Sequence, residues 1–202
     1  MKELILDTSS QFLFVNIVID GLVKYSVMSE GKNNHSDNLL KVIEEGFIQL
    51  DLKLNDIDRI VCGYGPGMYT GLRVSLTVAK MFSWTLNIPL YVISSLDLLA
   101  SGYFDKDGVY SIMIKAKKDH SYTKRICVKD SLVSVIKEEE FMKNEDFIKY
   151  TSFDDIIIDN SNIKINYLNI KESDKVLVTN VHALEPNYLR QDIWNIVWEL
   201  WR

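Results

Sequence analysis

Apolar and polar residues follow one another in short runs over the first thirty positions, which is typical of strands joined by turns. Apolar runs occupy positions 4–6, 12–19 and 22–28. Asp20-Gly21 separates the last two runs and is a strong signal for a two-residue hairpin. The polar residues at 7–10 predict a turn, because short polar side chains bond back to their own backbone. The chain is therefore expected to begin with a three-stranded antiparallel meander.

Two stretches with helical spacing follow the meander. The first helix is expected to begin near His35, with Ser36 or Asp37 as its N-cap, and its apolar residues cover more than one stripe. The second is expected over 72–86, where apolar residues fall nearly all round the cylinder. An apolar girdle indicates burial on two faces. One face is expected to cover the sheet, and the other to contact a second layer of this chain or another subunit.

The remaining elements are predicted to be shorter. Buried strands are expected at 59–63 and 90–93, and a helix from Ser94 or Ser95 is expected to run through Ala100 and to end at Gly102. A hairpin is expected to join 109–114 to 121–128. The charged residues at 138–140 and 143–146 predict a solvated face or loop, whereas 156–158 and 175–178 predict short buried strands.

This order of elements predicts two lobes. An α/β lobe is expected over 1–102, and a smaller, β-rich lobe over 103–202. Residues 193–201 have helical spacing and hold three of the four tryptophans. This terminal helix is expected either to dock on its own sheet or to bind a partner, since exposed aromatic clusters often mark interfaces.

Composition narrows the classes of function. The net charge of −5 and the pI of about 5.3 disfavour autonomous binding to nucleic acid, which usually requires a basic surplus. The two cysteines, Cys62 and Cys127, lack metal-type spacing and are expected to be buried or free thiols. The N-terminus reaches charged residues too early for a signal peptide, and no apolar run approaches a membrane span. A cytoplasmic protein is expected.

The loop at 65–73, Gly-Pro-Gly-Met-Tyr-Thr-Gly-Leu-Arg, is the strongest local signal. It joins a predicted strand to a predicted helix, and such a turn suits either an anion at the helix N-terminus or the close approach of another backbone. The dinucleotide fingerprint fails in both registers, because its last glycine would be Met68 or Thr70. A P-loop is excluded because the loop has no lysine.

Other catalytic patterns are weak. The three histidines, His35, His120 and His182, have no metal-ligand spacing, and no G-x-S-x-G elbow indicates a nucleophile. Asp7 in the first turn is a candidate to hold a metal or a water, but it fits an ordinary turn residue at least as well. Both interpretations stay open at this point.

Four stretches, in order, carry a resemblance to a known family. Residues 4–9 are similar to the Ile-Asp-Thr-Ser opening of the actin/hexokinase/Hsp70-like superfamily. The His-Ser-x-x-Leu-Leu at 35–40 resembles a helix-start motif of one branch. Residues 63–73 resemble that branch's G-x-G-P-G-S-F/Y-T-G-L/V-R signature, and 186–190 resemble its P-x-Y-L-R. The branch is the TsaB/YeaZ family, the non-catalytic subunit of the bacterial tRNA threonylcarbamoyladenosine synthase.

The resemblance implies a fold and a function. The fold would be α/β, with an actin-like (ASKHA/ribonuclease H-like) mixed-sheet lobe, flanking helices and a smaller degenerate second lobe. The chain would be a scaffold or activating subunit for modification of adenosine 37 in tRNA. Its partners would be a TsaD-type catalytic subunit and a small TsaE-type ATPase, with a homodimer possible in isolation and tRNA reached only through the complex. ATP and a metal are expected in the partners, and no cofactor in this subunit.

The resemblance also assigns roles to residues. No catalytic or metal-binding residue is expected, since 94–99 replace the histidine-rich metal stretch of catalytic relatives. Asp7, Thr8 and Ser9 are weak candidates for a nucleotide or for a turn. Gly65, Pro66, Gly67 and Gly71 are expected to shape the loop. The expected partner interface comprises His35, Leu39, Leu40, Ile43, Met68, Tyr69, Leu72, Arg73, Leu76 and Lys80.

Departures from the family pattern leave alternatives. Met68 replaces the usual serine, Lys41 replaces a frequent proline, and 115–117 read Lys-Ala-Lys where Asp-Ala-Arg is common. One alternative is an ATP-dependent phosphotransferase of the sugar-kinase type, with Asp7 near the metal. It would require a second phosphate loop, and none is found between 105 and 202. The other alternative is a protease-like activity, for which neither a metal constellation nor a nucleophile elbow is found.

Overall fold

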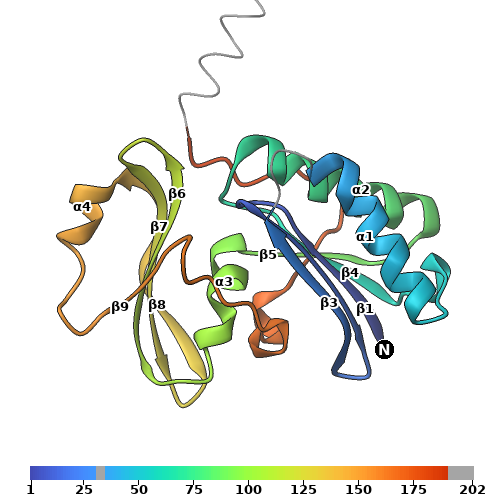
Figure 1. The fold of residues 1–202 in the computed structure, drawn as a ribbon, viewed down its shortest axis with the longest axis horizontal. Coiled ribbons are helices and arrows are strands. Elements are labelled where there is room, and N and C mark those ends of the chain that lie inside the picture. The colour runs from blue at the N-terminus through green and yellow to red at the C-terminus, as the bar shows by residue number, and fades with distance from the viewer. Residues whose placement is uncertain (31–34, 191–202) are drawn as a thin grey trace, which may run out of the picture.

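The computed structural model describes residues 1–30 and 35–190, together with the side chains of all of these except 35–37. Two mixed sheets form the molecule, with the strand orders β10-β5-β4-β1-β2-β3 and β8-β7-β6-β9. Figure 1 shows helices α1 and α2 on one face of the six-stranded sheet, and the four-stranded sheet on the other side of helix α3. The expected α/β, actin-like class is confirmed.

The opening meander is confirmed. Strands β1 (Lys2–Asp7), β2 (Phe12–Ile19) and β3 (Leu22–Glu30) pair antiparallel in sequence order. Asp20 and Gly21 both have positive φ, as the two-residue hairpin requires. Helix α1 (His35–Gln49) begins where the pattern predicts. Its expected N-cap side chains, Ser36 and Asp37, lie outside those described.

The elements around the glycine loop also follow the prediction. β4 (Arg59–Gly63) and β5 (Leu90–Ile93) pair in parallel, and β4 pairs in parallel with β1. The short 3-10 turn η1 (Leu54–Asp56) precedes β4, and α2 (Tyr69–Leu86) joins β4 to β5. Helix α2 begins three residues earlier than predicted, directly after the extended Met68, and it ends at Asn87 in the left-handed conformation.

Two buried cores lie on opposite faces of the first sheet. Alternate residues of β1 are divided between them: Leu4 and Leu6 pack toward α1 and α2, whereas Ile5 packs toward α3 and the second sheet. Helix α3 (Ser95–Ala100) is capped by Ser94, whose hydroxyl accepts a hydrogen bond from the Asp97 amide. The 3-10 turn η2 (Ser101–Tyr103) follows it. The central strands β1, β2, β4 and β5 are therefore buried on both faces, which explains their nearly continuous apolar residues, whereas the edge strand β3 is mostly exposed.

The second sheet contains one correction. β6 (Gly108–Lys117) and β7 (His120–Lys129) form the predicted hairpin. Residues 138–140, expected as a solvated face or loop, lie in the long strand β8 (Leu132–Lys143), and the following residues form α4 (Asn144–Ile148). Glu138 and Glu140 are exposed, as the solvated face predicts, but the side chain of Glu139 points inward to an ion pair with Lys124 on β7. The strand itself was not predicted.

The last strands are short and lie at sheet edges. β9 (Ile156–Ile158) pairs in parallel with β6, and β10 (Val176–Leu177) pairs antiparallel with β5 of the first sheet. Only Ile158 among them is buried, so the expectation of buried strands is wrong for the rest. The 3-10 turns η3 (Tyr167–Asn169) and η4 (Glu172–Asp174) lie between the two strands.

Strand β10 comes from the predicted second lobe but pairs with the first sheet. A strand from the second half of the chain completes the first sheet, so the polypeptide crosses between the two sheets more than once. The boundary between 1–102 and 103–202 stays a prediction. The expected terminal helix at 193–201 lies outside the described residues.

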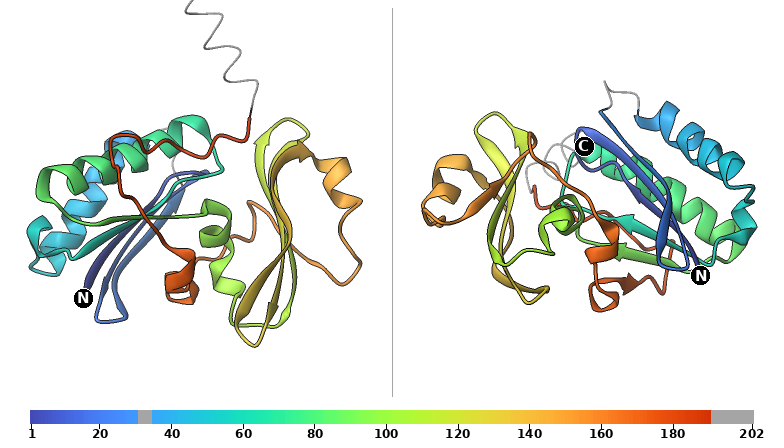
Figure 2. Two further views of the ribbon diagram at one scale, coloured as in Figure 1. Left: turned by 180° about the vertical axis from the view of Figure 1, so that it is seen from behind. Right: turned by 60° about the horizontal axis from the view of Figure 1, so that its bottom comes forward.

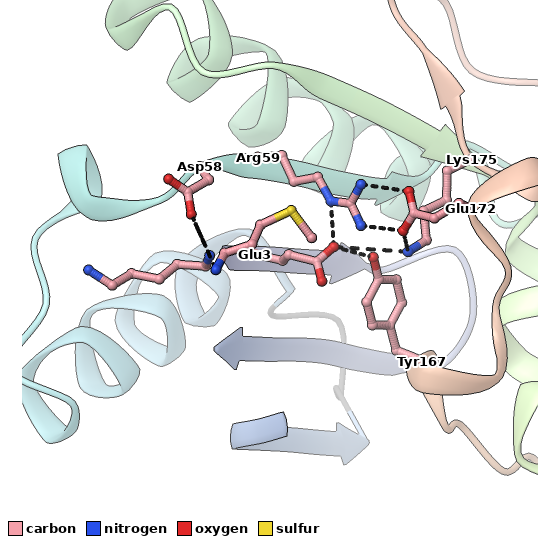
Figure 3. Close-up of polar contacts among 8 residues, drawn as sticks. Glu3, Asp58, Arg59, Tyr167, Glu172 and Lys175 are labelled. Atoms are coloured by element: carbon pink, nitrogen blue, oxygen red, sulfur yellow. Dashed lines mark hydrogen bonds and ion pairs between the residues drawn. The ribbon is translucent and has the colours of Figure 1, made fainter. Parts of the chain in front are cut away.

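An ion-pair network fastens this returning segment to the first sheet (Figure 3). Arg59 donates from Nε to Glu3 Oε1 at 2.5 Å and from both terminal nitrogens to Glu172 at 2.7 and 2.5 Å. The Tyr167 hydroxyl donates to Glu3 at 2.7 Å, and Lys175 donates to Glu172 at 2.6 Å. Burial first, and then the nearby Glu3 carboxylate, raise the pKa of Tyr167. The network therefore joins strands β1 and β4 of the first sheet to residues from the second half of the chain.

Within the described residues, no helix combines the length and the apolar character needed to cross a membrane.

Candidate functional site

The turn after β1 is buried and bonded within the chain. Asp7, Thr8 and Ser9 are each at most 1% exposed. The Asp7 carboxylate accepts hydrogen bonds from the Ser9 amide at 2.8 Å, the Ser9 hydroxyl at 2.7 Å and the Ser95 hydroxyl at 2.7 Å. Burial raises the pKa of Asp7, and the hydrogen bonds from Ser9 and Ser95 oppose that rise.

The glycine loop packs directly on this turn. Thr8 Oγ1 donates to the Gly71 carbonyl at 2.6 Å and accepts from the Ser75 amide at 3.1 Å. A Cβ at Gly71 would overlap the Thr8 carbonyl oxygen, and one at Gly67 would come within 2.5 Å of the Ser9 carbonyl oxygen. These glycines are required because two backbones approach closely.

Ser95 and Asn187 complete the enclosure of the loop. The Gly65 amide donates to Ser95 Oγ at 3.0 Å, and the Ser95 amide donates to the Gly65 carbonyl at 2.9 Å. The Asn187 amide donates to the Tyr64 carbonyl at 2.7 Å. Gly65 has a φ of +117°, in a buried Gly65-Pro66 segment whose peptide bond is cis.

These contacts distinguish between the two interpretations of the loop. The backbone amides of Ser9, Gly65 and Met68 each donate a hydrogen bond to another group of this chain. A phosphate bound at this turn would need free backbone amides as hydrogen-bond donors. It would also need the space beside the glycines, which the backbone of Asp7–Ser9 occupies. The contacts of these three amides and the close approach at the glycines favour the close-packing interpretation of the loop. Residue spacing gave no signal for the bond between Asp7 and Ser95, which are 88 positions apart.

The predicted interface residues separate into three groups. Leu39, Ile43, Leu72 and Leu76 are at most 3% exposed. Leu39, Ile43 and Leu76 lie in the core between the helices and the sheet, and Leu72 lies beside Gly65. All four side chains are already covered within this chain, which counts against a place at a partner interface. Leu40 and Met68 have 46% and 43% of their surface exposed, and the side chain of His35 lies outside those described.

The third group, Tyr69, Arg73 and Lys80, contacts residues from the other end of the chain. Arg73 Nε donates to the Tyr188 hydroxyl at 2.8 Å, and the Arg73 guanidinium lies 4.2 Å from the centroid of the Tyr69 ring. Lys80 Nζ donates to the carbonyls of His182 at 3.2 Å and Leu184 at 2.8 Å. Figure 2 shows this segment running beside α2. The motif at 186–190 thus holds the start of α2 in place.

The outer surface of the two helices retains large apolar side chains. Ile48 on α1 and Met81 and Trp84 on α2 are 74%, 43% and 64% exposed. Sequence analysis predicted an apolar surplus on α2 but did not assign it to Met81 and Trp84. A groove of about 440 Å³ runs along the same helix. It is lined by Tyr69, Thr70, Arg73, Val74, Thr77 and Val78.

A second polar cluster lies between the two sheets. Lys124 Nζ lies 2.6 Å from Asp97 Oδ2 and 3.5 Å from Glu139 Oε1. Glu139 also accepts hydrogen bonds from Ser94 Oγ and, at 3.1 Å, from Asn187 Nδ2. Burial opposes the charge on Lys124, yet the pKa of Lys124 is raised because Asp97 and Glu139 attract its proton.

Two members of this cluster, Ser94 and Asp97, lie in the segment 94–99 that was expected to replace a metal stretch. Burial raises the pKa of Asp97 and of Glu139, against the effect of Lys124. The ammonium group lies where a cation between the two carboxylates would lie. Across residues 1–30 and 35–190, no three metal-ligating side chains are grouped closely enough to hold an ion.

The sequence of this chain is similar to a family model and to several known proteins. The model of the family described as tRNA N6-adenosine threonylcarbamoyltransferase (TsaD) matches residues 29–190. The tRNA threonylcarbamoyladenosine biosynthesis protein TsaB of Bacillus subtilis is 29% identical over 149 residues, which are 74% of this chain and 65% of the relative. The protein of the same name from Haemophilus influenzae is 22% identical over 94% of both chains.

The fold is shared with a solved structure. A Pseudomonas aeruginosa protein, described as uncharacterized with similarity to peptidase YEAZ, has a TM-score of 0.77 at 19% identity. The superposition covers 94% of this chain and 99% of that one. Since the family model spans most of the described chain, the chain belongs to the tRNA N6-adenosine threonylcarbamoyltransferase family and is, within it, a TsaB/YeaZ member with an actin-like fold.

Proposed function

We propose that this chain is a non-catalytic scaffold or activating subunit of the complex that forms N6-threonylcarbamoyladenosine at adenosine 37 of tRNA. The names of its TsaB relatives, which describe threonylcarbamoyladenosine biosynthesis, support the pathway. The chain would bind a TsaD-type transferase subunit through the outer surface of α1 and α2. A TsaE-type ATPase would join the assembly, and ATP and metal would be supplied by the partners.

The observation that carries this proposal is the exposed apolar surface of the two helices, which we call the helix face. It comprises Leu40, Ile48, Met81 and Trp84. The opposite sides of both helices are committed to the core, so the helix face is surplus to the needs of this chain. Large exposed apolar patches mark protein interfaces. A stable interface buries more than about 1,000 Å² in total, which two helices of this length can supply.

A scaffold role is also supported by the closed turn. Asp7, the residue that an actin-like phosphotransferase would use near its metal, is buried against Ser9, Ser95 and the glycine loop. Asp97, in the segment that would correspond to the metal stretch, is paired with the Lys124 ammonium, which also lies near Glu139. Neither place offers an accessible carboxylate cluster to a substrate.

Co-expression with the transferase subunit of the same cell tests the proposal. We expect the two chains to elute as one species at micromolar concentration, with a mass equal to that of an assembly containing both. The transferase alone is expected to modify tRNA more slowly than the assembly. Two separate species, together with unchanged modification activity, would contradict the proposal.

A further inference from the structure

The tip of the β6–β7 hairpin gathers aromatic rings and cations around Phe141. The His120 ring stacks on Phe141, with centroids 5.2 Å apart and planes 18° apart, and the Tyr122 ring tilts against Phe141 at 5.6 Å. Lys117 Nζ lies 5.2 Å and the Arg190 guanidinium 5.5 Å from the centre of the same ring. Four side chains from three separate segments therefore converge on one half-buried phenylalanine.

Strand register explains the convergence. His120 lies opposite Lys143, and Tyr122 lies opposite Phe141, so these side chains share the inner face of the second sheet. Figures 1 and 2 show the end of the described chain beside this hairpin tip, which brings Arg190 to the rings. The His120 ring is oriented by its Nδ1, which lies 3.1 Å from the Lys118 carbonyl oxygen.

The charge at the tip is opposite to that of the whole chain. Lysines occupy positions 115, 117 and 118 in the hairpin, with Asp119 as the acidic residue of its turn. Lys143 adds a further cation at the end of β8. Asp146 on the neighbouring α4 is paired with Lys149 at 2.6 Å. In a chain with a net charge of −5, this concentration of lysines beside stacked rings is a local exception.

We infer that this cluster, the stacked pair Phe141 and His120 with the lysines around it, is a binding site for single-stranded RNA. A nucleobase would extend the stack on His120, and the lysines and Arg190 would contact the adjacent phosphates. RNA is chosen over other polyanions because stacked rings recognise unpaired bases, which heparin and duplex DNA do not present. The choice of tRNA as the natural ligand rests on the proposed function.

The site would act with the partner subunits, and the isolated chain would bind RNA measurably only at low salt. An acidic chain opposes polyanion binding at long range, so the cluster would add contacts once another subunit holds the RNA. The expectation that tRNA is reached only through the complex is thereby refined. The helix face and the hairpin tip would serve different ligands on one subunit.

Fluorescence anisotropy with the full chain and a labelled anticodon stem-loop RNA at about 50 mM salt tests the site. The double change Lys117→Gln and Lys118→Gln should weaken binding about 20-fold and reduce the salt slope by about 1.4, from two lost phosphate contacts. His120→Ala should weaken binding about fivefold, and His120→Phe should restore it because the stacking surface returns. Lys24→Gln with Lys106→Gln, two exposed lysines away from the tip, is the matched control.

Unchanged binding by the tip variants, or equal losses in the control, would overturn the inference. Equal competition by heparin and by unlabelled RNA, with no effect of His120→Ala, would also overturn it. Co-elution with the transferase is measured on the same variants. If the wild-type chain fails to co-elute while RNA binding follows the tip, the proposed function fails and the RNA site stands. If the wild-type chain co-elutes normally and the tip variants bind RNA as the wild type does, the RNA site fails and the proposed function stands.

Discussion

Two carboxylates stand at opposite ends of strand β1, and they are stabilised in different ways. Glu3 is paired with Arg59 and accepts from Tyr167, whereas Asp7 receives only neutral donors from Ser9 and Ser95. Both side chains are nearly fully buried. The first arrangement fastens the returning half of the chain through charge. The second fastens the glycine loop through hydroxyl and amide groups, and no cation offsets the burial that raises the pKa of Asp7.

The difference shows how one strand can serve two purposes. A buried ion pair is costly to break, because it leaves an uncompensated charge. A buried carboxylate among neutral donors can be replaced by a neutral isostere at small cost. We therefore expect stability to be sensitive to substitution of the charged groups at the Glu3 end. At the Asp7 end we expect it to be sensitive to added bulk at the glycines.

The largest effect is expected from bulk at the Asp7 end. Gly71→Ala should reduce the free energy of unfolding by about 4 kcal/mol or prevent folding, because its Cβ would overlap the Thr8 carbonyl oxygen. Gly108→Ala is the matched control, since its Cβ would meet Tyr110 at an ordinary 3.6 Å. Chemical denaturation measures both. A Gly71→Ala protein as stable as the Gly108→Ala protein would disprove the close approach.

The next effect concerns the Glu3 end. Arg59→Leu should cost about 3 kcal/mol, because the buried Glu3 would lose its hydrogen-bonded cation and keep only Lys175, at 4.0 Å. Adding Glu3→Gln to this variant should recover part of the loss by removing the stranded charge. Denaturation midpoints of the single and double variants test the coupling. A double variant whose loss equals the sum of the two single losses would show that the pair is not coupled.

A smaller effect is expected at Asp7 itself. The raised pKa means that the folded state keeps this proton to higher pH than the unfolded chain, whose ordinary value is 3.8. Its contribution to stability is therefore greatest at acidic pH and falls as pH rises through the raised pKa. Asp7→Asn should change stability at pH 7 by less than about 1 kcal/mol and should flatten this dependence. Asp7→Ala should cost about 2 kcal/mol, since three donors lose their acceptor.

The smallest effect is expected at Glu172, which is well exposed. Arg59 first, and then Lys175, lower the pKa of Glu172 to about 2. Its contribution to stability is present above the unfolded value of 4.5 and is lost as pH falls through about 2. Solvent screening limits that contribution to less than about 1 kcal/mol. Thermal melting of Glu172→Gln between pH 2 and 6 should show a slightly weaker acid dependence than the wild type.

Sequence patterns predicted the elements whose signals are local. The meander, α1, α2 and the β6–β7 hairpin each carry their periodicity or their turn residues within a few positions. Strand β8 was missed because only Glu139 of its acidic triplet faces inward, toward Lys124, a residue 15 positions away. The site depends on still longer distances. The bonds of Asp7 to Ser95 and of Arg73 to Tyr188 join residues that the fold alone brings together.

The same limit explains the interface prediction. A helix that is apolar all round does not reveal which stripe its own sheet will cover, so Leu72 and Leu76 could not be distinguished from Met81 and Trp84. In the structure the first pair is buried and the second pair is exposed.

Titration of the transferase subunit with matched surface variants tests the proposed role of the helix face most directly. Trp84→Glu places a charge on the helix face, and Phe153→Glu makes the same change at a fully exposed aromatic residue after α4 in the second lobe. We predict that Trp84→Glu weakens binding to the transferase at least tenfold, because its charge would be desolvated in the interface. Phe153→Glu should bind as the wild type does. Equal binding by both variants would contradict the placement of the interface on α1 and α2.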